Sequence, residues 1–222
     1  MVLISNGSPC YLISLDAAKA FDRVWRDGLL YKLINKINSY TWRIFKSYYD
    51  SSQGVIKKDD LNAADTFRIE CGVKQGGVMS PLFYNFYIND LLEECLKSKL
   101  GARINNINVC IISYCDDIII MSPSFKQAQE LLNICNEYTN SWKIVFNANK
   151  SKLLKFYEFI RNGFVINKTS LPEVDEIKYL GVQINNKLDF NLIFYNNKFH
   201  CIRKSIYTLY SFGLKKMDLI RN

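Results

Sequence analysis

The stretch Asn108-Val109-Cys110-Ile111-Ile112-Ser113-Tyr114-Cys115-Asp116-Asp117-Ile118-Ile119-Ile120-Met121 decides the fold, because two adjacent carboxylates interrupt an apolar, strand-forming run. Burying these charges in a core costs several kcal/mol per ion unless a cation compensates them. A tight hairpin solves the conflict by lifting both aspartates to the surface. A third aspartate, Asp16, ends another strand-like run, Cys10 to Leu15. Three carboxylates on two strand ends suit a two-metal phosphoryl-transfer site.

Size and composition indicate a folded protein with one large domain, or one domain and a small appendage. The chain has 222 residues, and 49% of them are hydrophobic. No apolar run approaches the roughly 20 residues of a membrane span. Met1 to Pro9 lack the features of a signal peptide. The seven cysteines contain no Cys-x-x-Cys pair, which disfavours a zinc site. Most of them lie among Ile, Val and Leu, which predicts reduced thiols in an intracellular protein. Because no apolar run is long enough for a membrane span, no membrane partner is expected.

The positive charge is concentrated in the carboxy-terminal part of the chain. Lys and Arg number 29 against 21 acidic residues, a formal net charge of +8. From Lys143 to Lys216 there are 13 basic and 5 acidic residues, and the rest of the chain is balanced. A basic part beside an acidic catalytic part fits a polyanionic partner. A solvated basic face is the alternative.

The order of predicted elements indicates an α+β fold, with helices packed on one face of an antiparallel sheet. Ser80 and Pro81 are predicted to be the cap and first residue of a long helix, with Leu82 and Leu96 among its mostly inward residues. The expected strands are Cys10–Asp16, Thr66–Glu70, the two arms of the aspartate hairpin, Leu153–Phe156, Gly163–Ile166 and Ile177–Ile184. The expected helices cover Leu29–Ile37, Thr41–Tyr49, Pro81–Lys97, Phe125–Trp142 and much of the last forty residues, and Ser51–Asp65 reads as a loop or hairpin.

Five motifs occur in a fixed order along this pattern. They are Asp16-x-x-x-x-Phe21, Gln75-Gly76 with Ser80-Pro81, Tyr114-Cys115-Asp116-Asp117, Asn147-x-x-Lys150 and Tyr179-Leu180-Gly181. The series resembles the reverse transcriptase domain of non-long-terminal-repeat (LINE-like) retrotransposons, from about Ser8 to Gly181. The resemblance implies a polymerase palm over residues 1–184 and the start of a helical thumb over 185–222.

The resemblance assigns metal binding and catalysis to Asp16, Asp116 and Asp117. Two Mg²⁺ ions, or Mn²⁺ in their place, would activate a primer 3′-hydroxyl and neutralise the leaving pyrophosphate. Ala17 is expected to offer its carbonyl as a further ligand. Lys150 corresponds to a lysine that protonates the pyrophosphate or steadies the phosphates. Aspartates that only cap turns are the plain alternative for the triad.

Further residues carry substrate roles by the same resemblance. Phe21 matches a steric gate that excludes the 2′-hydroxyl, although an apolar Phe after a strand is by itself more often a core residue. Gln75 and Gly76 match the loop against the incoming nucleotide and template, and Tyr114 is grouped with these substrate-binding residues. Primer and template contacts are expected from Tyr179, Leu180, Gly181, Lys198, Arg203 and Lys204. The alternative for the hairpin at Tyr179-Leu180-Gly181 is a strand with a glycine bulge. The alternative for the three basic residues is a set of solvated charges.

Two departures from the family pattern affect the expected activity. Cys115 stands where the family usually has Ala, and its thiol is open to oxidation. By the same resemblance a fingers segment would precede Asp16, and we expect it to be largely missing. The leading hypothesis is therefore an RNA-directed DNA polymerase domain that uses an RNA template, a DNA primer and dNTPs, as a truncated copy of doubtful activity alone. The alternatives are an inactive nucleic-acid-binding remnant and, less well matched, a group II intron or telomerase-type enzyme.

Overall fold

The computed structural model describes residues 9–56, 65–157 and 163–187. The chain divides into two compact units, residues 1–175 and 176–222, and each is described by itself. The predicted helix in the last forty residues lies outside the described residues. Within the described ranges, no helix combines the length and the apolar character needed to cross a bilayer.

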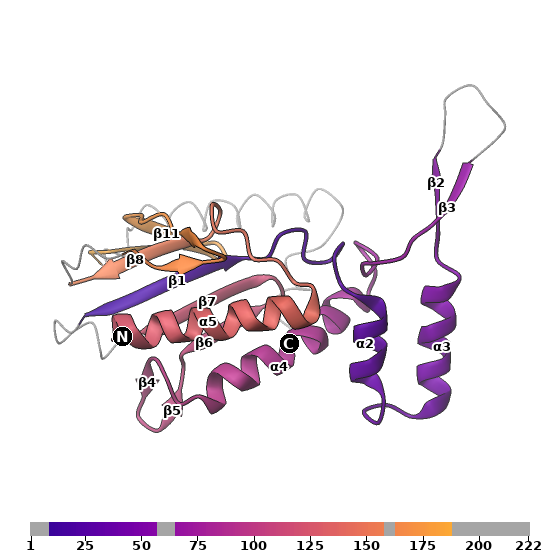
Figure 1. Cartoon of the computed structure of the whole chain (residues 1–222), viewed down its shortest axis with the longest axis horizontal. Coiled ribbons are helices and arrows are strands. Elements are labelled where there is room, and N and C mark those ends of the chain that lie inside the picture. Colours follow the sequence, from indigo (N-terminus) through magenta and orange to yellow (C-terminus); the bar gives the residue numbers. More distant parts are fainter. Residues whose placement is uncertain (1–8, 57–64, 158–162, 188–222) are drawn as a thin grey trace, which may run out of the picture. The chain divides into compact units, whose positions relative to one another are not determined.

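A four-stranded antiparallel sheet forms the centre of the first unit (Figure 1). Its strands are β1 (Cys10–Asp16), β6 (Ile111–Tyr114), β7 (Asp117–Ser122) and β8 (Lys152–Phe156), in the order β6-β7-β1-β8. The register pairs Leu15 with Ile118 and Asp16 with Asp117. The alternation of side chains along β1 sends Tyr11, Ile13 and Leu15 into the core. The central strands are therefore held by burial up to the point where the aspartates begin.

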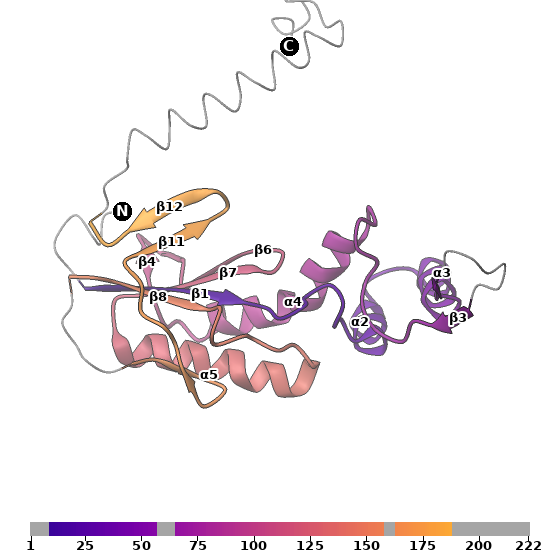
Figure 2. The ribbon, with the colours of Figure 1, turned by 90° about the horizontal axis from the view of Figure 1, so that it is seen from above.

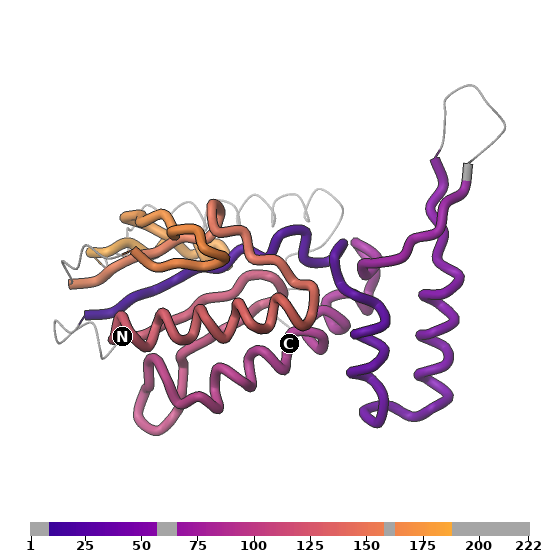
Figure 3. Tube along the Cα trace, viewed as in Figure 1, coloured from indigo at the N-terminus to yellow at the C-terminus, as the bar shows by residue number. Residues whose placement is uncertain are grey.

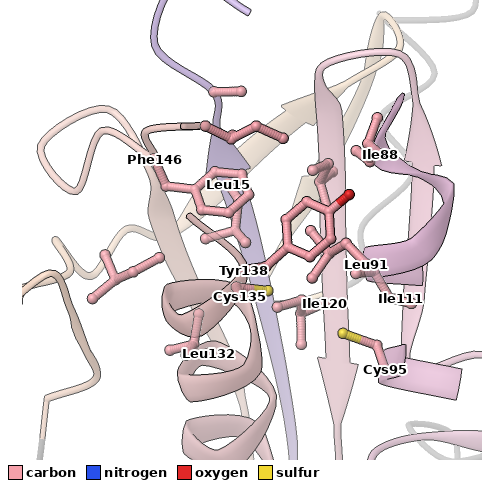
Figure 4. Close-up of a cluster of buried hydrophobic side chains, with 14 of the residues drawn as sticks. Leu15, Ile88, Leu91, Cys95, Ile111, Ile120, Leu132, Cys135, Tyr138 and Phe146 are labelled. Atoms are coloured by element: carbon pink, nitrogen blue, oxygen red, sulfur yellow. The ribbon is translucent and has the colours of Figure 1, made fainter. Parts of the chain in front are cut away.

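Two long helices, α4 (Ser80–Lys97) and α5 (Phe125–Trp142), cover one face of this sheet (Figure 2). The bounds of α5 agree with the prediction. Figure 4 shows the core where the two helices meet the sheet, with Leu91 and Cys95 of α4, Ile111 and Ile120 of the sheet and Leu132 of α5 in one buried cluster. The predicted α+β architecture is thus confirmed. The inward face of α4 was misjudged in part, since Leu82 and Leu96 are 59% and 39% exposed while Tyr84 and Tyr87 are buried.

A helical pair and a hairpin lie between β1 and α4 in the sequence (Figure 3). Helix α2 (Arg26–Leu33) packs beside α3 (Ser39–Asp50), and β2 (Gln53–Ile56) pairs with β3 (Asp65–Arg68). The hairpin reading of this region is confirmed. The prediction that α2 continues to Ile37 was wrong, because Ile34 leaves the helical backbone (ψ 133°) and Asn35 follows in the left-handed region (φ 65°).

A buried lysine ties α2 to the two long helices. Lys32, whose side chain is 5% exposed, pairs with Asp90 at 2.9 Å. Its ammonium also donates to the Tyr87 carbonyl (2.6 Å) and the Tyr138 hydroxyl (2.5 Å). It lies 3.8 Å from the centre of the Trp142 ring and about 5 Å from the Tyr87 and Tyr138 rings. This aromatic cage joins α2, α4 and α5.

The remaining strands are short. In the first unit β4 (Arg103–Ile104) pairs with β5 (Ile107–Asn108), and β9 (Val165–Ile166) pairs with β10 (Thr169–Ser170). In the second unit β11 (Glu176–Tyr179) pairs with β12 (Val182–Asn185). The hairpin expected at Tyr179-Leu180-Gly181 is confirmed. The strand-like run Ile177–Ile184 is therefore two strands, since Leu180 and Gly181 have φ of 46° and 76° and turn the chain back on itself.

Candidate active site

The aspartate hairpin has the tight turn that the sequence predicts. Tyr114 pairs directly with Asp117, so that Cys115 and Asp116 form a two-residue turn between β6 and β7. Cys115 takes a left-handed backbone (φ 52°), which such turns require. Ile118 to Ile120 are buried at once after the turn. Asp116 therefore stands at the tip, and Asp117 at the exposed start of β7.

The first aspartate lies beside this turn. Asp16 is the last residue of β1 and the register partner of Asp117, which places their Cα atoms about 4.5–5.5 Å apart. The pKa of Asp117 is raised by partial burial first, then by the negative charges of Asp116 and Asp16. The three carboxylates are thus close enough to influence one another electrostatically. The register places Asp16 beside Asp117, and the convergence of Asp16, Asp116 and Asp117 on one ion stays a prediction.

The donor chemistry of this corner fits a divalent cation. Carboxylate oxygens are the ligands that Mg²⁺ and Mn²⁺ prefer, and a cation would relieve the repulsion that raises the pKa of Asp117. In the described part of the chain, however, no three such side chains are grouped tightly enough to hold an ion as they stand. Binding would therefore require the carboxylates at the strand ends to change rotamer.

Cys115 is a tolerable replacement in this turn. Its side chain is half-buried and packs against the core. Burial raises the pKa of its thiol, and the neighbouring Asp116 and Asp117 raise it further. Because the thiolate is the reactive form, this environment lowers the reactivity of the thiol.

The loop that carries Lys150 is fastened to the backbone of Asp16. The Asp16 carbonyl accepts from the Asn147 amide at 2.8 Å, and the Asp16 amide donates to Ser151 Oγ at 3.1 Å. Ala17 is buried and forms an isolated antiparallel bridge with Phe146. Lys150 itself is exposed in the turn between Asn147 and Ser151. The structure therefore brings the Asn147–Lys150 motif next to the first aspartate.

Phe21 lies against a tyrosine that sequence reasoning missed. The rings of Phe21 and Tyr84 are 5.2 Å apart between centroids and tilted by 30°. Tyr84 comes from α4 and is 1% exposed, whereas Phe21 is half-buried. Burial raises the pKa of Tyr84, and the charges of Asp116 and Cys115 raise it further. Its hydroxyl has no hydrogen-bond partner among the described residues. Tyr84 thus connects Phe21 to the aspartate turn.

The loop of Gln75 and Gly76 is hydrogen-bonded to the segment that contains Phe21. The Val73 amide donates to the Phe21 carbonyl at 2.8 Å, and Gln75 Nε2 donates to Asp22 Oδ1 at 2.9 Å. Gly76 has a φ of +75°, and a Cβ there would meet open space, so the glycine is required by its backbone angle. Asp22 and Gln75 are among the residues that line a cleft of about 710 Å³.

The start of α4 differs in detail from the prediction. Met79 is the cap residue, Ser80 is the first helical residue, and no side chain caps the helix. The Ser80 hydroxyl instead donates to the Lys74 carbonyl at 2.5 Å. Ser80 therefore closes the Gln75–Gly76 loop rather than capping the helix, and the predicted cap was wrong by one residue.

The structure describes only some of the remaining residues that are predicted to contact substrate, primer or template. Tyr114 is 64% exposed next to Asp117. Tyr179 ends β11, and Leu180 and Gly181 form the turn of the β11–β12 hairpin, which belongs to the second unit. The last three predicted contact residues, Lys198, Arg203 and Lys204, lie outside the described residues.

Comparison with known proteins identifies the family. The profile of the reverse transcriptase (RNA-dependent DNA polymerase) family matches residues 2–184. The chain belongs to the reverse transcriptase family. It is 32% identical over 184 residues to the RNA-directed DNA polymerase from mobile element jockey of Drosophila funebris, covering 79% of this chain and 20% of that protein. It is 26% identical over 188 residues to the probable RNA-directed DNA polymerase from transposon X-element of Drosophila melanogaster, covering 82% and 20%.

These relatives confirm the resemblance to LINE-like reverse transcriptases. The chain spans about a fifth of the length of the curated relatives it matches. Among solved reverse transcriptase structures, apo telomerase from Candida tropicalis superimposes with a TM-score of 0.64 at 15% identity, covering 86% of this chain and 36% of that one. A telomerase from the same organism in complex with a fragment of telomeric RNA gives 0.61 at 14% identity, covering 86% and 31%. This likeness supports the palm fold.

Proposed function

We propose that this chain is the palm of an RNA-directed DNA polymerase, which extends a DNA primer with dNTPs along an RNA template. The register of Asp16 opposite Asp117, with Asp116 at the adjoining turn, carries the proposal. Family membership supports it. On this proposal residues 1–184 form the palm, and residues 185–222 begin a thumb.

In the proposed mechanism Asp16, Asp116 and Asp117 hold two Mg²⁺ ions, or Mn²⁺ in their place, with the Ala17 carbonyl as a further ligand. A metal held by these carboxylates would supply the charge that lowers the pKa of the attacking 3′-hydroxyl and neutralises the leaving pyrophosphate. The bond from Asn147 to the Asp16 carbonyl would keep Lys150 within reach of the same phosphates. Lys150 would steady the pyrophosphate or protonate it as it leaves.

The remaining residues would position substrates. Gln75 and Gly76 would lie against the incoming nucleotide and template, with the exposed ring of Tyr114 beside the reacting groups. The β11–β12 turn and the basic residues after it would hold the primer and duplex backbone without reading sequence. These contacts are Tyr179, Leu180, Gly181, Lys198, Arg203 and Lys204.

Primer extension on poly(A)/oligo(dT) with Mg²⁺ tests the proposal. We expect wild type to incorporate dTTP and Asp116→Ala to lose incorporation. Asp50→Ala is the control, because Asp50 is an exposed carboxylate whose partner is Lys46. Equal incorporation by wild type and Asp116→Ala would remove the triad's role. Salt-sensitive duplex binding without incorporation would instead favour a nucleic-acid-binding remnant, a function to which the net charge of +8 also points.

Replacing Phe21 by alanine is expected to admit ribonucleotides. The contact of Phe21 with the buried Tyr84 ring would limit the movement of Phe21, which supports its proposed role in excluding a 2′-hydroxyl. Loss of the ring should reduce the preference for dTTP over UTP by roughly 10- to 100-fold, the scale at which pocket shape discriminates substrates. The measurement is the ratio of kcat/KM for the two nucleotides. An unchanged ratio in an active Phe21→Ala enzyme would refute the gate.

A further inference from the structure

Arg26 is a buried cation that joins three segments around the Gln75–Gly76 loop. The residue is 8% exposed at the start of α2. Its Nε donates to the Gly72 carbonyl at 2.9 Å, and its Nη1 donates to the carbonyls of Tyr49 (3.2 Å) and Ile69. The guanidinium also lies 4.9 Å from the centre of the Tyr49 ring. One side chain thus connects the end of α3, the exit of β3 and the loop before Gln75.

These partners match the shape and charge of an arginine. The Tyr49 carbonyl lies in the last turn of α3, where the helix dipole favours a positive charge. The guanidinium has donors fixed in a plane, so one group reaches carbonyls on separate segments, which the point charge of a lysine does not do. Burial lowers the pKa of Arg26. Its desolvation is offset by the carbonyl bonds and the Tyr49 ring.

The loop held by Arg26 is in register with the Phe21 segment. The Gly72 amide donates to the Val24 carbonyl, and the Val73 amide to the Phe21 carbonyl, both at 2.8 Å. The approach is close, since a Cβ on Gly72 would lie 2.7 Å from the Asp22 carbonyl oxygen. Arg26 therefore holds this loop at Gly72, where the two hydrogen bonds to the Phe21 segment begin. Gln75 lies three residues further along the same loop.

We propose that Arg26 is a positioning residue for the incoming nucleotide, which it serves by holding the Gln75–Gly76 loop in register with Phe21. The inference rests on the proposed function, in which this loop and Phe21 contact the nucleotide. Without the guanidinium, the loop would occupy its binding-competent arrangement only part of the time. The apparent affinity for the nucleotide falls in proportion to that fraction, whereas turnover at saturation is largely kept.

The test compares Arg26→Lys with Arg43→Lys, the same substitution at an exposed position on α3. We expect Arg26→Lys to raise the KM for dTTP about tenfold while kcat stays within about twofold. Arg43→Lys should match wild type. The amides of Gly72 and Val73 should exchange with solvent faster in Arg26→Lys, with α5 unchanged. An unaltered KM, or a fall in kcat together with faster exchange throughout α5, would overturn the inference.

Arg26→Ala provides a second test, in which added guanidinium replaces the missing side-chain group. Free guanidinium ion at low concentration should restore the protection of the Gly72 and Val73 amides and lower the KM again, which a general loss of stability would not allow. Failure of guanidinium to restore either would count against the proposal. A wild-type protein that incorporates no nucleotide defeats the proposed function, whereas an active wild type with an unaffected Arg26→Lys variant defeats only the role of Arg26.

Discussion

Asp117→Asn is expected to slow Mg²⁺-dependent primer extension by about two to three powers of ten. A bound metal supplies several kcal/mol of transition-state stabilisation, and each ~1.4 kcal/mol lost is a tenfold slower step. Asparagine keeps the shape of the side chain but removes the anionic oxygen that the metal requires. The measurement is single-turnover incorporation of dTTP by wild type and variant. A variant within about threefold of wild type would show that Asp117 is not a ligand.

The same substitution should make the metal-free protein more stable at neutral pH. The pKa of Asp117 is raised in the folded state, by burial and by Asp116 and Asp16. A raised carboxyl pKa means that folding favours the protonated form, so wild-type stability should fall as the pH rises through that pKa. Asp117→Asn lacks this dependence. Thermal unfolding across the acidic range checks it, and a variant less stable than wild type at neutral pH would contradict the expected repulsion.

Lys32→Ala is expected to lower the free energy of unfolding by about 3 kcal/mol. Truncating a buried side chain leaves a cavity, and a desolvated cation–π contact adds about 2 kcal/mol, partly offset because a buried charge no longer has to be desolvated. Burial lowers the pKa of Lys32, while Asp90 opposes that shift. Chemical denaturation measures the change.

Lys46→Ala is the matched control for Lys32. Lys46 also pairs with a carboxylate, Asp50 at 2.6 Å, but the pair is exposed on α3. Its loss should cost about 0.3–0.5 kcal/mol, as for other exposed helix pairs. Equal effects of the two substitutions would mean that the aromatic cage adds nothing to the attachment of α2.

The sequence predicts the structure correctly where the local residue pattern and the need for burial favour the same element. The run around Asp116 and Asp117 permits few arrangements besides a tight hairpin, because Ile118 to Ile120 must be buried and the carboxylates must not. The apolar period of Phe125–Trp142 is typical of a helix packed on one side, and α5 has those bounds. The position of Asp16 at a strand end follows from the same alternation.

The sequence does not predict the contacts between side chains that lie far apart in the chain. A lysine and an arginine in α2 look like solvated charges, yet Lys32 enters a cage from α4 and α5 and Arg26 binds carbonyls of three segments. Tyr84 reads as one more apolar residue of α4, and only the fold brings it to Phe21. Backbone conformation also differs from the prediction, since non-helical Ile34 and left-handed Asn35 end α2 early. None of these contacts has a periodic signal.

Binding of Mn²⁺ is the most direct test of the account, since everything depends on the carboxylates of Asp16, Asp116 and Asp117 meeting at one ion. Electron paramagnetic resonance would count the ions bound by wild type and by a variant with all three changed to asparagine. We expect wild type to bind Mn²⁺, Mg²⁺ to displace it, and the triple variant to lose this binding while remaining folded. Equal binding by wild type and triple variant, or none by wild type with nucleotide present, would contradict the account.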